Sequence, residues 1–156
     1  MTIQTQLVGA FGEKMAEAEL LRRGWRTANF NTSITNAAEH DLIAEKGSRL
    51  VQLRVKTCGP GWNSFQFSCP VGKEFATDVP ANDYTILVLM REDRRDDKFY
   101  IMPTSILRKQ INDARRRKSS LDFGLCSLKM RPHRSERDRV EYDFEQKWQC
   151  HLEKWD

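Results

Sequence analysis

The strongest constraint on the fold lies near the middle of the chain. Two extended runs, residues 41–46 and 49–56, are separated only by Gly47 and Ser48. Both runs are rich in apolar and β-branched residues, and a two-residue loop that begins with glycine is typical of a type II′ turn. The sequence therefore predicts an antiparallel hairpin whose register is fixed by its turn.

This register decides which side chains share a face of the hairpin. Counting back from the turn, Lys46 faces Arg49 and Asp41 faces Arg54, and directly opposed residues of an antiparallel pair point to the same side. One face then carries Glu39, Asp41, Ile43, Gln52, Arg54 and Lys56, and the other carries His40, Leu42, Ala44, Leu53 and Val55. The charged face forms either a solvated salt-bridge ladder or a functional site, and clustered ionisable groups at the rim of a core favour the site.

The rest of the chain predicts one α/β domain over residues 1–156, a length suited to a single core. Helical spacing of Phe11, Met15, Ala18 and Leu21 predicts a first helix that ends at Gly24. Further expected elements are strands at 25–30, 64–68, 84–90 and 99–102 and helices at 104–117 and 142–155. This order indicates a mixed central sheet flanked by helices, with no periodic pattern over residues 119–139.

Positive charge is concentrated in one basic segment, residues 108–139. This segment carries 11 Lys or Arg against 4 Asp or Glu, whereas residues 1–107 carry 13 of each. It either neutralises phosphates of nucleic acid or forms a solvated loop. The candidate nucleic-acid contacts are Arg115, Arg116, Arg117, Lys118, Arg131 and, after Gly59-Pro60-Gly61, Trp62. Trp62 stacks on a base or covers the core, and loop aromatics favour the core.

Composition also indicates the cellular compartment of the protein. No stretch approaches the roughly 18 consecutive apolar residues of a membrane span, and the N-terminal region becomes acidic before any signal-like apolar run. The four cysteines form no CxxC pair, which favours reduced thiols over a structural zinc site. We therefore expect a cytoplasmic protein that does not contact membranes.

Three segments together resemble the PD-(D/E)XK nuclease-like superfamily, in particular its small Holliday-junction-resolvase-like and homing-endonuclease-like members. They read GEKMAEAELLRRGW, HDLIAEKGSRLVQLRVKT and FYIMP, within residues 9–103. Each motif alone is weak, but their order is that of the family: a helix with Gly-Glu, a strand that begins at Asp, and a strand that ends in Lys-Thr. The resemblance implies a restriction-endonuclease-like fold and cleavage of DNA with Mg²⁺ or Mn²⁺.

The resemblance also implies roles for three residues. Asp41 matches the family's metal-binding Asp, Lys56 the Lys that activates water or stabilises the charged phosphate, and Glu13 the supporting helix Glu. A hard cation prefers oxygen ligands of this kind and lowers the pKa of bound water. However, the position two residues before Lys56, usually acidic or Gln, is Arg54, and a guanidinium cannot bind a cation.

This departure leaves three readings open. In the first, Glu39 or Glu13 replaces the missing acid and binds the metal together with Asp41 and the Val55 carbonyl. In the second, the positive charge of Arg54 replaces that of the metal, and the protein binds the phosphate backbone without cleaving it. In the third, Arg54 stabilises the transition state while one metal stays on Asp41 and Glu13.

A monomer of this size covers few base pairs, so we expect a homodimer or homotetramer to act on duplex or junction DNA. Two sets of aromatic residues are candidates either for that interface or for the core: Phe65 and Phe67, and Phe144, Trp148 and Trp155.

Overall fold

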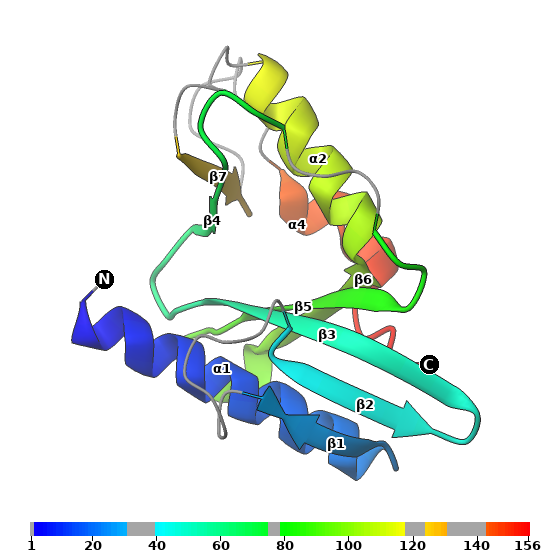
Figure 1. The fold of residues 1–156 in the computed structure, drawn as a ribbon. Coiled ribbons are helices and arrows are strands. Elements are labelled where there is room, and N and C mark those ends of the chain that lie inside the picture. The colour runs from blue at the N-terminus through cyan, green and yellow to red at the C-terminus, as the bar shows by residue number, and fades with distance from the viewer. Residues whose placement is uncertain (1, 31–39, 75–78, 118–123, 131–142) are drawn as a thin grey trace.

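The computed structural model describes residues 2–30, 40–74, 79–117, 124–130 and 143–156, and its fold is a mixed α/β arrangement of sheet and helices (Figure 1). The central sheet has the strand order β1-β2-β3-β5-β6. Its strands are β1 (Arg26–Asn29), β2 (Leu42–Lys46), β3 (Arg49–Cys58), β5 (Asp83–Leu89) and β6 (Lys98–Pro103). Only β3 and β5 pair in parallel; the other pairs are antiparallel. The expected mixed sheet is confirmed.

Helices and a second small sheet cover the two faces of the central sheet. Helix α1 (Ile3–Arg22) lies on one face, and α2 (Thr104–Arg117), α4 (Phe144–Lys147) and the pair of β4 (Ser64–Ser68) with β7 (Leu125–Lys129) lie on the other (Figure 1). Two 3₁₀ turns, Arg94–Asp96 and Gln149–His151, complete the described elements. No described helix combines the length and the apolar character that crossing a bilayer needs.

The hairpin has the register that its turn predicts. Lys46 pairs with Arg49 and Leu42 with Leu53, and Gly47 has a φ of +62°, a conformation that favours glycine. The alternation places Leu42 and Leu53 in the core beneath α1. The opposite face of the hairpin is therefore the one that turns toward α2.

Helix α1 packs on the sheet through a different set of residues from the one whose spacing predicts the helix, although Met15 of that set also packs against the core. Its buried positions are Gly12, Ala16 and Leu20, whereas Phe11 and Leu21 are exposed. A Cβ atom at Gly12 would lie 1.9 Å from the Thr57 Oγ1 atom on β3. The helix backbone thus approaches the sheet as closely as only glycine permits.

Two apolar clusters fill the space on either side of the sheet. The cluster under α1 includes Leu20, Trp25, Leu42, Leu53, Ile86 and Trp155, and the cluster under α2 includes Phe65, Phe67, Leu87, Tyr100, Phe144 and Trp148. All five aromatic residues considered as interface candidates are buried. They are core residues, and their interpretation as an interface is wrong.

The predicted helix over 142–155 is also wrong. The chain is helical only over Phe144–Lys147, continues as a 3₁₀ turn, and then extends so that Leu152 bridges to Tyr100 of β6. Trp148 enters the cluster under α2, while Trp155 enters the cluster under α1. One straight helix cannot place both rings on opposite faces of the sheet. A strand was missed as well: β7 lies inside residues 119–139, where no period was found.

Candidate functional site

Asp41 stands immediately before β2, where the β2–β3 ladder ends. Its backbone N–H donates to the Leu53 carbonyl at 2.9 Å, and its Oδ2 atom accepts the Val55 N–H at 2.7 Å. The carboxylate therefore takes the position that a strand carbonyl would occupy in a longer ladder. This bond fixes the Asp41 side chain at the edge of the sheet, next to the residue that precedes Lys56.

Lys56 projects from β3 on the α2 side of the sheet, where its ammonium group lies 5.9 Å from the centre of the Phe67 ring. Burial lowers the pKa of Lys56 below its ordinary value, and the negative charge of Asp41 partly opposes this effect. Asp41 accepts the N–H of Val55, the residue directly before Lys56, at 2.7 Å. The structure therefore places Asp41 and Lys56 at the same end of the hairpin.

A second carboxylate, which sequence reasoning missed, lies beside this pair. Asp83 begins β5 and is only 2% exposed. Its Oδ1 atom accepts the Thr104 hydroxyl at 2.6 Å, and its Oδ2 atom lies 2.9 Å from His40 Nε2 and 3.6 Å from Arg54 Nη2. Burial alone would raise the pKa of Asp83, but the hydrogen bonds from Thr104 and His40 and the charge of Arg54 hold it below its usual value.

We call Asp83 and its partners Thr104, His40 and Arg54 the Asp83 cluster. In this cluster the predicted face of His40 is wrong, and Arg54 has a partner that the sequence did not indicate. His40 was placed on the face of Leu42, yet its ring reaches Asp83 on the face of Arg54. This is possible because β2 begins only at Leu42, so strict alternation does not extend to His40. A polar residue directly before the apolar run 84–90 was the one available signal for Asp83, since a buried carboxylate requires partners.

The remaining predicted metal ligands are not assembled in the described part of the chain. Glu13 is half-buried on α1, and Glu39 lies outside the described residues. Among the residues that the structure describes, no group of three or more His, Cys, Asp or Glu side chains is placed to hold a metal ion. Near Asp41 the described side chains include two cations, Lys56 and Arg54. Without Glu39, which lies outside the described residues, the described donor set is incomplete for a divalent cation, so we derive no chemical step through one.

Arg115 is wrongly predicted as a contact to nucleic acid. It is 1% exposed, and its guanidinium group donates to the carbonyl oxygens of Lys73 at 2.8 Å and Pro70 at 2.9 Å. Arg116 is exposed but forms an ion pair with Glu74. Arg115 therefore holds the loop after β4 onto α2. The side chain of Arg117, and Lys118 and Arg131 entirely, lie outside the described residues.

The position of α2 also separates its basic end from the site. Thr104, the first residue of α2, contacts Asp83, and Arg115 follows eleven residues later. At 1.5 Å per residue these positions are about 16 Å apart along the axis. The basic end of α2 therefore does not line the immediate approach to the Asp83 cluster.

Trp62 is more exposed than its expected place in the core allows. Its ring lies against Gly59, but 40% of the residue is exposed. It borders an open groove of about 980 Å³ together with the charged turn between β5 and β6, which includes Arg91, Glu92, Asp93, Asp96 and Lys98.

The four cysteines are free thiols, of which Cys150 is exposed.

The arrangement of these elements is similar to that of a bacterial homing endonuclease, I-Ssp6803I. The similarity covers 97% of this chain and 89% of that chain, with a TM-score of 0.51 and 16% sequence identity. The chain has a nuclease-like fold. At this identity the similarity concerns the fold alone. No protein-family model matches the sequence, and no curated protein matches it either.

Proposed function

We propose that this protein is a DNA endonuclease of the PD-(D/E)XK type that hydrolyses a phosphodiester bond at the site that contains Asp41 and Lys56. The observation that carries the proposal is the juxtaposition of these two groups, with the ammonium of Lys56 partly removed from water. A desolvated lysine beside a fixed carboxylate is typical of catalytic sites. The similarity of the fold to a homing endonuclease supports DNA as the substrate.

The residues of this site have complementary tasks in this proposal. Protonated Lys56 presents a positive charge to the phosphate; its lowered pKa enlarges the fraction of the neutral amine, and that form instead accepts a proton from attacking water. The Asp41 carboxylate is held by the Val55 N–H, so it can orient that water without rearranging. We expect the reaction to require Mg²⁺ or Mn²⁺, with Glu39 as the further carboxylate.

A second function is favoured by the ion pair between Arg54 and Asp83. The buried Asp83 orients the guanidinium group on the same strand and the same face as Lys56. Two cations at adjacent positions of one strand face form a suitable clamp for a backbone phosphate. In this alternative the protein binds DNA but does not cleave it.

Incubation with DNA separates the two functions. Purified protein is mixed with linear, supercoiled and four-way-junction DNA in Mg²⁺, Mn²⁺ or EDTA, and the products are resolved on gels. An endonuclease nicks or linearises DNA only when a divalent cation is present. Salt-sensitive binding without any product supports the clamp, and the absence of both cleavage and binding at low salt contradicts both functions.

Replacement of Arg54 by Gln is expected to weaken DNA binding and to reduce the dependence of affinity on salt by about one phosphate contact. The physical reason is that the substitution removes one cation from the face that carries Lys56. Fluorescence anisotropy with labelled duplex over a salt series measures both effects. Arg26→Gln is the matched control, because Arg26 is an exposed arginine of β1 that pairs with Glu45. An unchanged salt dependence in Arg54→Gln would argue against a phosphate contact at this residue.

A further inference from the structure

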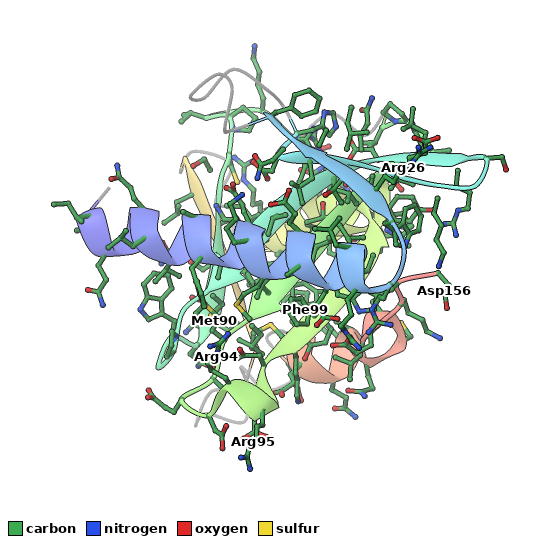
Figure 2. All side chains as sticks on the ribbon, turned by 90° about the horizontal axis from the view of Figure 1, so that it is seen from below. Arg26, Met90, Arg94, Arg95, Phe99 and Asp156 are labelled. Atoms are coloured by element: carbon green, nitrogen blue, oxygen red, sulfur yellow. The ribbon has the colours of Figure 1, made fainter. Side chains whose placement is uncertain are left out.

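Helix α1 carries an apolar stripe on the side that faces away from the sheet. Ile3 is 76% exposed, Leu7 65%, Phe11 42% and Leu21 55%, and Ala18 is exposed as well. The helix runs across the front of the view in Figure 2, and the guanidinium group of Arg94 lies over the Phe11 ring at 5.5 Å. An exposed row of large apolar side chains on a structured helix indicates a contact surface.

The spacing of the stripe is that of a helix–helix seam. Positions 7, 11, 14, 18 and 21 follow intervals of four, three, four and three residues, the repeat by which one helix packs along another. The side of α1 that packs on the sheet is a different one, formed by Gly12, Ala16 and Leu20. The helix therefore has two packing faces, and the sheet accounts for only one.

We propose that the stripe is covered by α1 of a second copy of this chain, with the two helices antiparallel and fully overlapping. Overlap of Ile3 with Arg22 of the second copy places Leu7 on its Ala18 and Phe11 on its Lys14. In this register Leu7 packs on the small Ala18, and Leu21 lies opposite Gln4, in both directions across a two-fold axis. The aliphatic stem of Lys14 offers apolar surface to Phe11.

Charge favours this partner and this direction. No residue from Thr2 to Gly12 is charged, so the helix itself offers no charged partner in this half to a nucleic-acid backbone or a charged protein surface. Arg94, from the 3₁₀ turn Arg94–Asp96, lies over the Phe11 ring and borders the stripe at this point. Lys14 is already paired with Glu17 of its own helix at 2.9 Å. A parallel pair would instead set Lys14 against Lys14 and Phe11 against Phe11, placing like charges opposite each other.

The contact area indicates a reversible dimer. Helix α1 has 20 residues, which gives a length of about 30 Å, and one helix–helix contact of this length buries less than the roughly 800 Å² per partner of stable complexes. We therefore expect association that depends on protein concentration in the micromolar range.

Sedimentation velocity over a concentration series tests this association. The Leu7→Glu variant is expected to have a dimer dissociation constant at least about tenfold higher than that of the wild type, because it places a carboxylate between the two helices. Leu50→Glu is the matched control: Leu50 is 54% exposed on β3, away from α1. A wild type that stays monomeric at high concentration, or equal effects of both variants, would overturn the proposal. Circular dichroism verifies that each variant is folded.

Cysteine crosslinking tests the direction of the helices. In a Cys150→Ser background, which removes the exposed thiol, the double variant Leu7→Cys/Ala18→Cys is expected to form a covalent dimer under mild oxidation. Neither single variant does so in the antiparallel pair. A covalent dimer of Leu7→Cys alone would show a parallel pair, and no covalent dimer of the double variant would show that α1 is not the interface.

Discussion

Replacement of Lys56 by Ala is expected to reduce the rate of DNA cleavage by at least about 100-fold, as is replacement of Asp41 by Asn. Lys56→Ala removes the cation that faces the phosphate. Asp41→Asn removes a charge but keeps an oxygen that can accept the Val55 N–H, so the edge of the hairpin stays intact. Initial rates of nicking of a supercoiled plasmid, at DNA concentrations that saturate each variant, measure the loss.

The same assay has a control and a pH signature. Lys14→Ala removes an exposed lysine that pairs with Glu17 on α1, and it should cleave at the rate of the wild type.

Because burial lowers the pKa of Lys56, its neutral form appears at a pH below the ordinary lysine pKa of about 10.4. If neutral Lys56 accepts the proton, the cleavage rate rises with pH through this lowered pKa. Cleavage by Lys56→Ala at the wild-type rate would exclude this site as the active site.

Replacement of Gly12 by Ala is expected to lower the free energy of unfolding by about 3 kcal/mol. The added Cβ would lie 1.9 Å from Thr57 Oγ1 and 2.8 Å from Thr57 Cγ2, and neither atom is at the end of a flexible chain. Helix α1 must therefore move away from β3, which opens the core around Ala16 and Leu20. Urea unfolding followed by circular dichroism measures the change.

Two further variants make this prediction specific. Gly9→Ala adds the same methyl group to the same helix where nothing lies within 4 Å of it, so it should be neutral or slightly stabilising because alanine favours helix. Thr57→Ala removes two of the atoms that Gly12→Ala would meet and should restore part of the loss in the double variant. Equal stability of Gly9→Ala and Gly12→Ala would contradict the close approach of α1 to β3.

Local patterns were sufficient to predict the hairpin and its register. The Gly47-Ser48 turn fixes the register, and the register places Asp41 and Lys56 on neighbouring strands with no further information. Helix α2 was likewise predicted with its bounds, because Leu107 and Ile111 follow helical spacing and are buried. In each case the residues that carry the signal are close together in the sequence.

Features that depend on distant contacts could not be predicted in this way. Asp83 meets Arg54 across the parallel pair of strands, and Arg115 bonds to carbonyl groups about 40 residues earlier, so its charge suggested DNA rather than burial. For α1, Phe11 and Leu21, two of the apolar residues whose spacing predicts the helix, are exposed, because the helix approaches the sheet along the line of Gly12, Ala16 and Leu20. Trp148 and Trp155 have helical spacing but pack on opposite faces of the sheet.

The parallel pairing of β3 with β5 has a consequence for the order in which the protein becomes competent. Parallel neighbours cannot be joined by a tight turn, and here the chain leaves the sheet for β4 before it returns at Asp83. A chain emerging from the ribosome as far as Cys58 already contains Asp41 and Lys56, but neither Asp83 nor Thr104. The guanidinium of Arg54 gains its partner Asp83 only after β5 has been synthesised, and Asp83 gains its bond from Thr104 only after the chain has reached α2.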